Sequence, residues 1–241
     1  TIIREADRLG VLVWAEIPVY WTIDWSDPRP LASARQQLAE MIGRGRDRNR
    51  AAVVLWSIAN ETPISEPRNA FLRTLIDDAR RLDPTRLLTA ALQARGEGDT
   101  HVIDDPIGEQ LDVMGNNEYV GWYDGTPEKC DRVTFRSPWT KPLVMSEFGA
   151  DALAGYRGAP HQRFTEDYQE VVYQRQIAML KRIPFLRGTA PWILMDFRSP
   201  RRPLPVIQEG WNRKGLVSER GLRKRPFYVL QAFYEELAGR R

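Results

Sequence analysis

Short, continuous runs of apolar residues, each ending in polar side chains, constrain the fold of this chain most. The runs are rich in Val, Ile, Leu and Trp, and they are too short for most helices. They cover Val11–Glu16, Ala52–Asn60, Leu87–Leu92, Leu111–Asn117, Pro142–Gly149 and Leu186–Met195. Strands buried on both faces of a parallel sheet have this pattern, whereas strands with one solvated face alternate apolar and polar residues. The runs therefore predict a parallel sheet in an α/β fold.

Segments with helical periodicity lie between or beside these runs. Asn69–Leu82 places its apolar residues on one face and stops before Pro84, and Glu166–Ile183 and Phe227–Leu237 have a similar period. Strands that recur every 25 to 47 residues with helices between them favour a (β/α)8 TIM barrel. A doubly wound sheet is the alternative, but no glycine-rich phosphate-binding turn follows a strand.

Six strands can be counted, whereas a TIM barrel has eight. We therefore expect residues 1–241 to form one partial TIM-barrel catalytic domain in which the first two βα units are missing. Thr1–Leu9 has the amphipathic pattern of the last turns of a helix, and Gly10 is expected to end it. A start within a helix indicates an N-terminal truncation. An open sheet would expose strand edges, so that closure by another chain or a homo-oligomer is left open.

Composition and charge exclude several classes of protein. No apolar run approaches the roughly 18 residues that cross a bilayer, and 24 aromatic residues argue against disorder. A formal net charge of +3 is too small for a typical nucleic-acid binder. One cysteine, Cys130, rules out an internal disulfide, and two histidines, His101 and His161, argue against a multi-histidine metal site. We expect no metal and no cofactor, no nucleic-acid or membrane partner, and, as the favoured location, the cytoplasm.

Two strand ends carry glutamates. The strand Ala52–Asn60 leads into Glu61, and Pro142–Gly149 contains Glu147 near its end. The C-terminal strand ends of an α/β barrel line its active site, and retaining glycoside hydrolysis needs two carboxyl groups there, one as acid/base and one as nucleophile. Asn60, beside the first of them, is expected to hydrogen-bond a sugar hydroxyl and so orient the site. The alternative is that each glutamate merely pairs with one of the many arginines.

Aromatic and amide side chains at other strand ends suit a sugar. Asn117, Tyr119, Trp122 and Tyr123 follow the fourth strand, and Trp192 is expected within the last one. Rings stack on sugar faces and amides bind hydroxyl groups, although each of these residues alone is more often part of a core. Glu16, which ends the first strand, is either a further site carboxylate or a structural residue.

Three motifs together resemble glycoside hydrolase family two, the family of β-galactosidases, β-mannosidases and β-glucuronidases. They are Leu12–Pro18, Trp56–Glu61 and Met145–Gly149. The resemblance covers essentially the whole chain but only the later part of that family's barrel. It implies that Glu61 is the acid/base and Glu147 the nucleophile. The family normally has β-sandwich domains and two further strands before the barrel strand that comes first here, and one of those strands supplies a histidine.

Within the family the chain is most similar to β-glucuronidases. Asn117–Tyr123 resembles their Asn-x-Tyr-x-Gly-Trp-Tyr segment, and Phe148–Gly155 resembles the stretch that follows their nucleophile. Asn212 and Lys214 resemble an Asn-x-Lys motif that implies contacts with the C6 carboxylate of the substrate, where an ammonium and an amide would bind a uronate. The expected function is hydrolysis of terminal β-D-glucuronides by double displacement. A β-galactosidase-type specificity is one alternative, and a non-catalytic carbohydrate-binding or inactive remnant is another.

Overall fold

A computed structural model describes residues 2–44 and 49–239. It divides into two compact units. Unit 1 contains the described residues up to Gly96, together with Val102–Asn117 and Arg136–Val144. Unit 2 contains Glu97–His101, Glu118–Phe135 and the described residues from Met145 onward. The chain therefore passes from one unit to the other several times.

The main sheet has six strands in the hydrogen-bonded order β1-β2-β3-β6-β8-β9. Their bounds are β1 Val13–Glu16, β2 Val53–Asn60, β3 Leu87–Leu92, β6 Val113–Asn117, β8 Leu143–Glu147 and β9 Leu186–Thr189. The pairs β1–β2, β2–β3 and β3–β6, all in unit 1, are parallel. Most residues of β2, β3 and β6 are buried, which explains why these strands are continuously apolar. The α/β prediction is confirmed.

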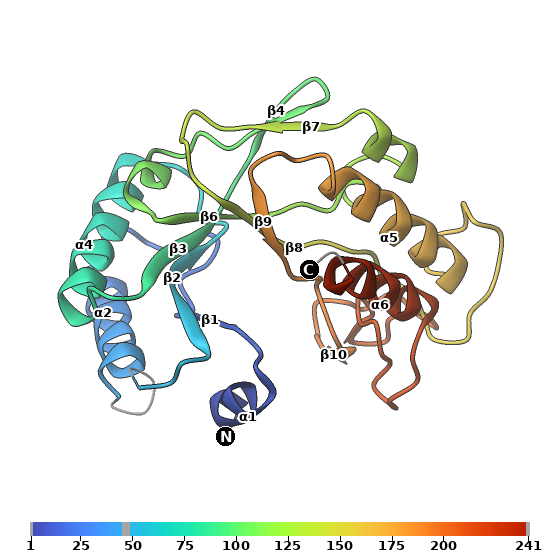
Figure 1. Cartoon of the computed structure of the whole chain (residues 1–241), viewed down its shortest axis with the longest axis horizontal. Coiled ribbons are helices and arrows are strands. Elements are labelled where there is room, and N and C mark those ends of the chain that lie inside the picture. The colour runs from blue at the N-terminus through green and yellow to red at the C-terminus, as the bar shows by residue number, and fades with distance from the viewer. Residues whose placement is uncertain (1, 45–48, 240–241) are drawn as a thin grey trace. The chain divides into compact units, whose positions relative to one another are not determined.

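Two helices of unit 1 lie side by side, and one of them was predicted. Helix α4, Glu66–Leu82, begins at Ser65, whose hydroxyl accepts the N–H of Arg68, and Asp83 and then Pro84 follow it. It starts three residues before the predicted helix because Pro67 fits a first turn. Helix α2, Pro28–Gly43, was not predicted. Figure 1 shows α2 beside α4.

The first helix, α1, covers Ile2–Leu9 and is followed by Gly10 at a φ of +69°. Its predicted extent is confirmed apart from Thr1, which lies outside the described residues. The strand after it starts at Val13 rather than at Val11, because the N–H of Val11 bonds to the carbonyl of Ala6 at the end of α1.

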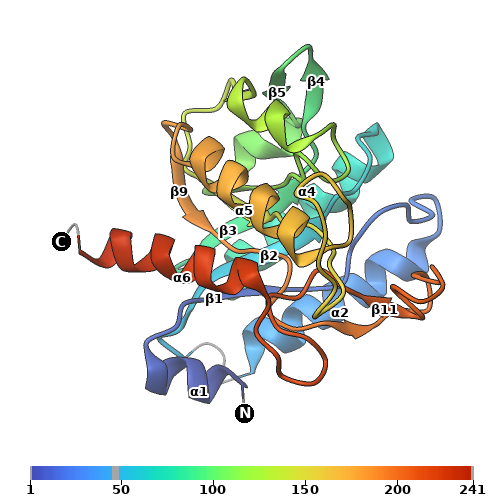
Figure 2. The same ribbon diagram turned by 90° about the vertical axis from the view of Figure 1, so that its right-hand side faces the viewer.

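Unit 2 is built around two adjacent helices. Helix α5, Glu166–Leu180, starts at Thr165, and helix α6, Arg225–Ala238, starts after Lys224. Figure 2 shows α6 lying alongside α5, which also packs against the 3₁₀ helix η2, Pro127–Asp131. Both helices were predicted to within three residues at each end. No helix among residues 2–44 and 49–239 has the length and apolarity that crossing a membrane requires.

Several short elements were not predicted. They are the 3₁₀ helix η1, Pro106–Gln110, a sheet with the order β4-β5-β7, and an antiparallel pair β10–β11. The strands are β4 Arg95–Glu97, β5 Thr100–Val102, β7 Thr134–Arg136, β10 Phe197–Arg198 and β11 Trp211–Asn212. Strands of two or three residues are too short to show a period.

The last predicted strand, Leu186–Met195, is wrong in its extent. Strand β9 ends at Thr189, so that Trp192 follows the strand instead of lying within it. The physical reason is Pro191, which has no N–H to donate to a strand ladder. The Trp192–Ile193 peptide bond is cis.

Candidate active site

In unit 1 the end of β2 presents a hydrogen-bonded glutamate. Both carboxylate oxygens of half-buried Glu61 accept hydrogen bonds, one from Asn117 Nδ2 at 3.0 Å and one from Trp21 Nε1 at 3.0 Å. Asn117 also donates to Asn60 Oδ1 at 2.8 Å. Three predicted site residues of unit 1, Asn60, Glu61 and Asn117, are therefore in direct contact.

The backbone of Glu61 is unusual for a side-chain-bearing residue. Its φ of +50° lies in the left-handed region, which favours glycine. Its N–H bonds to the carbonyl of Ala91 at 2.9 Å, and its carbonyl accepts a hydrogen bond from Gln93 at 3.4 Å. Contacts with the neighbouring chain segment thus hold the conformation that turns the glutamate away from the strand direction.

Trp21 is a contact of Glu61 for which the sequence predicted no role. It also has a positive φ, of +56°, and its N–H bonds to the carbonyl of Asn60. Aromatic residues after a strand end predict a sugar site at Tyr119. The same signal, applied to Tyr20 and Trp21 after the first strand, would have found it.

Glu16 lies near this group at the end of β1. Its carboxylate accepts hydrogen bonds from Ser57 Oγ at 2.7 Å and Trp14 Nε1 at 3.1 Å. Desolvation by the surrounding protein raises its pKa although part of the side chain faces solvent, and the negative charge of Glu61 adds to the rise. The two hydrogen bonds lower the pKa by a smaller amount. Glu16 therefore contributes to the electrostatics around Glu61.

In unit 2 the second glutamate ends β8. The hydroxyl of Tyr119 donates a hydrogen bond to Glu147 Oε2 at 2.5 Å, and the N–H of Glu118 bonds to the Glu147 carbonyl at 3.0 Å. Gly149, two residues further on, has a φ of +138°. A Cβ atom there would lie 2.7 Å from the hydroxyl of Tyr173, so the close packing after Glu147 requires glycine.

The predicted carboxylate-binding lysine is buried in unit 2. Lys214 Nζ lies 2.7 Å from Asp151 Oδ1 and 2.7 Å from the hydroxyl of Tyr123, whose ring also faces the ammonium. Asn212 Oδ1 accepts the backbone N–H of Lys214 at 3.1 Å. Asp151 was not predicted, and Gln208 donates to its other oxygen. The motif Asn-x-Lys is thus held together locally, with its positive charge balanced by Asp151.

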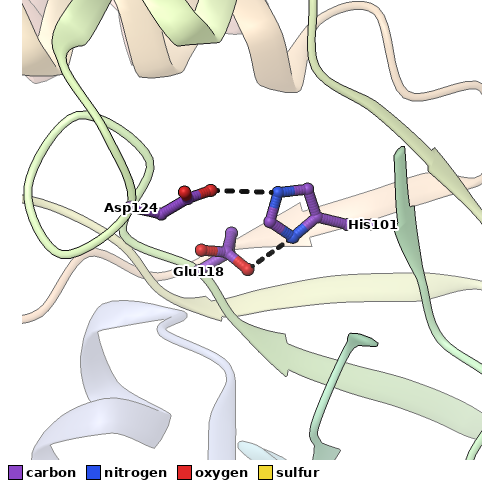
Figure 3. A group of neighbouring side chains, drawn as sticks. All are labelled: His101, Glu118 and Asp124. Atoms are coloured by element: carbon purple, nitrogen blue, oxygen red, sulfur yellow. Dashed lines mark ion pairs between the residues drawn. The ribbon is translucent and has the colours of Figure 1, made fainter. Parts of the chain in front are cut away.

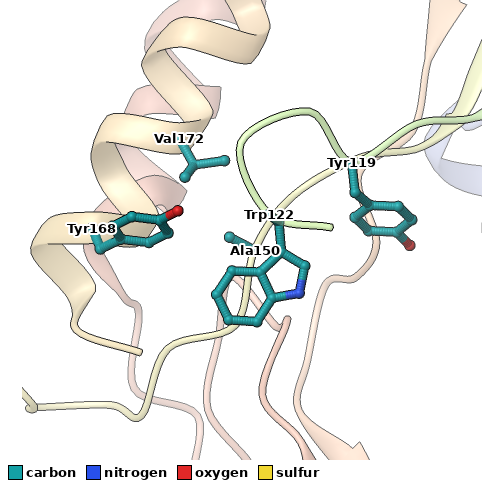
Figure 4. Close-up of a cluster of buried hydrophobic side chains, with 5 residues drawn as sticks. All are labelled: Tyr119, Trp122, Ala150, Tyr168 and Val172. Carbon is teal, nitrogen blue, oxygen red and sulfur yellow. The ribbon is translucent and has the colours of Figure 1, made fainter. Parts of the chain in front are cut away.

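A buried aromatic cluster supports Tyr119. Figure 4 shows Tyr119 and Trp122 with Ala150, Tyr168 and Val172, and Phe164 and Trp192 pack against the same cluster. The hydroxyl of Tyr168 donates to the carbonyl of Gly121 at 2.5 Å. Trp122 is therefore a core residue, whereas Trp192 is half-buried at the edge of the cluster.

The predicted site residues accordingly fall into two groups, one in each unit. Glu61, Asn60 and Asn117 form the group in unit 1. The group in unit 2 contains Glu147, Tyr119, Tyr123, Trp192, Asn212 and Lys214. Every one of these side chains lies at or after a strand end, or in a loop that contacts one.

Comparison with known families decides which fold family this is. The family model described as glycosyl hydrolases family 2, TIM barrel domain, matches residues 1–225. The chain belongs to this family. The motifs around Glu61 and Glu147 lie within the matched residues, so the resemblance inferred from the sequence is confirmed at the level of the family.

Curated relatives of this family 2 chain include two β-glucuronidases. One, from Paenibacillus borealis, is 28% identical over 98% of this chain and 41% of its own length. The other, from Felis catus, is 30% identical over 98% of this chain and 37% of its own length. The chain therefore spans about two fifths of the length of the curated relatives it matches.

Solved structures of the same fold include a β-glucuronidase from an uncultured Clostridium sp., 25% identical with a TM-score of 0.79 over 97% of this chain and 42% of that chain. A family 2 β-galacturonidase from Eisenbergiella tayi bound to galacturonate is 22% identical, with a TM-score of 0.82 over 97% of this chain and 42% of that chain. The likeness to the latter concerns the fold.

Proposed function

We propose that this chain carries the catalytic residues of a retaining β-glycosidase that acts on terminal β-D-glucuronides. The observation that carries the proposal is that two motif glutamates end strands of one sheet, each with hydrogen-bond donors on its carboxylate. Membership of glycosyl hydrolases family 2 and the names of the curated relatives support it. The substrate is a carbohydrate, and no metal or cofactor takes part in the chemistry.

In this mechanism Glu61 donates a proton to the glycosidic oxygen while Glu147 attacks the anomeric carbon. The bond between that carbon and the glycosidic oxygen breaks, the aglycone leaves as an alcohol, and the sugar remains as a covalent glycosyl ester on Glu147. Glu61, now a carboxylate, then removes a proton from water, and the hydroxyl attacks the same carbon and releases the sugar. Hydrogen bonds from Asn117 and Trp21 orient Glu61, and the hydroxyl of Tyr119 orients Glu147.

The uronate specificity rests on Lys214 and Asn212. The ammonium of Lys214 matches the charge of a carboxylate, and the amide of Asn212, whose oxygen accepts the backbone N–H of Lys214, supplies an N–H donor for it. Asp151 and Tyr123 hold this ammonium in place. Asn60, Asn117, Tyr119, Tyr123 and Trp192 are assigned to substrate binding.

We further propose that the six strands are six of the eight of a (β/α)8 barrel, and that residues 1–241 form a single partial barrel domain. The strand order supports this because consecutive βα units of such a barrel place their strands side by side in chain order.

A mechanism-based label tests the assignment of the nucleophile. A 2-fluoro-β-glucuronide should form a stable ester on Glu147, which peptide mass spectrometry locates. Labelling of a different residue in folded protein would overturn the assignment.

The acid/base is tested by rescue. Glu61→Ala should lose activity on unactivated substrates, and azide should restore turnover of an activated aryl glucuronide because that leaving group needs no proton donor. Glu40→Ala, which removes an exposed glutamate on α2, is the matched control and should behave like the wild type. Unchanged activity in Glu61→Ala would exclude the acid role.

A further inference from the structure

Outside the predicted site, a buried histidine of unit 2 lies between two carboxylates. His101 Nδ1 is 2.8 Å from Glu118 Oε2, and His101 Nε2 is 3.2 Å from Asp124 Oδ2 (Figure 3). The histidine is 8% exposed, and its ring stacks on Phe135. Lys129 Nζ is 2.5 Å from the other oxygen of Asp124. Two positive groups thus face two negative ones when the histidine is charged.

The two carboxylates stand at the two ends of one turn. We call residues 118–124 the aromatic turn, because it carries Tyr119, Trp122 and Tyr123. The carbonyl of Tyr119 accepts the N–H of Trp122 at 2.9 Å and of Tyr123 at 3.0 Å, and the N–H of Gly121 bonds to the carbonyl of Asp124 at 2.8 Å. The turn is therefore stabilised by hydrogen bonds between its own residues, and His101 lies between Glu118 at its start and Asp124 at its end.

The aromatic turn contacts both Glu147 and Lys214. Its first residue, Glu118, donates its N–H to the Glu147 carbonyl, and Tyr119 donates its hydroxyl to the Glu147 carboxylate. Tyr123, next to Asp124, contacts Lys214 through its hydroxyl. A displacement of the turn would move the partners of the nucleophile and of the carboxylate-binding lysine together.

We propose that the doubly protonated side chain of His101 is a positioning residue, which ties Glu118 to Asp124 and so holds the aromatic turn against Glu147 and Lys214. The proposal deepens the proposed function and rests on it. It makes glycoside turnover depend on the protonation of a residue that does not contact the substrate.

The chemistry of the ring favours this role over that of a metal ligand. A metal ion binds the lone pair of a ring nitrogen, whereas each nitrogen of His101 lies within ion-pair distance of its own carboxylate, an arrangement that a doubly protonated, positively charged ring satisfies at both ends. A neutral ring has one N–H, so that one nitrogen lone pair would then point at a carboxylate. Loss of the proton therefore replaces one attraction by a repulsion at one end of the turn.

The charges around His101 set the direction of the pH dependence. Burial lowers the pKa of His101, but the hydrogen bond and charge of Glu118 and the charge of Asp124 raise that pKa by more, against a lowering by Lys129. The net shift is upward. The bridge therefore stabilises the folded state fully below the ordinary histidine pKa, and this stabilisation is lost as the pH rises through the raised pKa.

A titration by NMR tests the bridge without any substrate. The chain has two histidines, and His161, in an exposed loop, is an internal reference. In protein labelled at the histidine ring, with His161→Gln to assign the signals, His101 should titrate above the ordinary histidine pKa. Glu118→Gln and Asp124→Asn should each lower the pKa of His101. Titration of His101 at or below the ordinary histidine pKa, or a pKa insensitive to both substitutions, would overturn the bridge.

Kinetics test the link to turnover. For an aryl β-glucuronide, kcat/KM of His101→Gln should be about tenfold below wild type at acidic pH, since small misplacements of active-site groups have effects of at least this size. The two should converge as the pH rises past the pKa of His101, and Asp124→Asn should show the same convergence. His161→Gln should match the wild type throughout.

A ratio of wild type to His101→Gln that stays constant across the pH range would mean a merely structural residue and would refute the positioning role. Wild-type protein that hydrolyses no glycoside would instead refute the proposed function. In that case the NMR titration still decides whether charged His101 bridges the aromatic turn.

Discussion

Lys214 has to serve two partners. Its ammonium lies on Asp151 inside unit 2, and under the proposed function it also binds a substrate carboxylate. Both side chains of the pair are at most 1% exposed, so neither charge can be left to water. A buried pair of this kind gains little net stability, but removal of one partner leaves an uncompensated charge.

Substitution of either member of this pair is therefore expected to destabilise the protein. Lys214→Met or Asp151→Asn alone should each lower the free energy of unfolding by about 3–5 kcal/mol, and the double variant should lose less than the sum. Urea unfolding monitored by fluorescence measures this.

The folded double variant is also the informative one for specificity, because it removes the ammonium without leaving its partner charged. It should lose turnover of an aryl β-glucuronide and retain turnover of the matching neutral glycoside, if the chain accepts one. Equal loss on both substrates would contradict a role of Lys214 in binding the carboxylate.

A second prediction at the scale of single residues concerns the hydrogen bond from Tyr119 to Glu147. A hydrogen bond to a charged group contributes about 1.5–3 kcal/mol, so Tyr119→Phe should lower kcat/KM by roughly 10- to 100-fold while the protein stays folded. Tyr228→Phe removes an exposed hydroxyl from α6 and serves as the control. Pre-steady-state kinetics of ester formation on Glu147 measure the effect, and an unchanged rate would contradict it.

At the scale of elements, the connection from β2 to α4 positions Glu61. The side chain of Arg68 in the first turn of α4 bonds to Thr62, the residue after Glu61, and forms a buried ion pair with Asp105. Ser65 caps the same helix. The start of α4 and the residue that follows Glu61 are thus fixed to each other.

The cap of α4 can be tested by itself. Ser65→Ala should lower the stability by about 1 kcal/mol, whereas Ser65→Asp should keep the cap because aspartate also accepts the backbone N–H. Chemical denaturation gives both values. An aspartate variant as unstable as the alanine variant would show that the side chain acts in another way.

The elements that the sequence predicts well are those whose signal is local. The mainly apolar strands and the glutamates at their C-terminal ends belong to this class, as do helices with many apolar residues on one face. Helix α2 was missed because its buried side chains, Ala34, Leu38 and Ile42, are few. The bridges from Asp151 to Lys214 and from His101 to Glu118 join distant segments, and no local pattern records such pairs.

At the scale of the whole molecule, two boundaries between the compact units fall within the predicted site motifs, after Asn117 and after Val144. The Asn-x-Tyr segment is split, with Asn117 in unit 1 on Glu61 and Tyr119 in unit 2 on Glu147. Strand β8 is split in the same way, since its first two residues belong to unit 1 and the rest to unit 2. The hydrogen bonds from Asn117 to Glu61 and from Tyr119 to Glu147 thus each lie within one unit.

Cys130 offers a reporter for the opening of unit 2. Burial raises the pKa of its thiol to about 12, and the side chain is fully buried. Because the thiolate is the reactive form, we expect no reaction with a disulfide reagent at pH 8 until unit 2 unfolds. Thiol modification followed through a denaturant series measures this, and rapid stoichiometric reaction of the native protein would contradict it.

The left-handed backbone of Glu61 has a further consequence. A side-chain-bearing residue in this region costs about 1–2 kcal/mol relative to glycine, so Glu61→Gly should be more stable than Glu61→Ala, although both lack the carboxyl group. Thermal melts of the two variants would compare them directly. Because neither variant retains the hydrogen bonds from Asn117 and Trp21, the difference between their melting temperatures isolates the conformational strain of the backbone at position 61 from the loss of the carboxyl group.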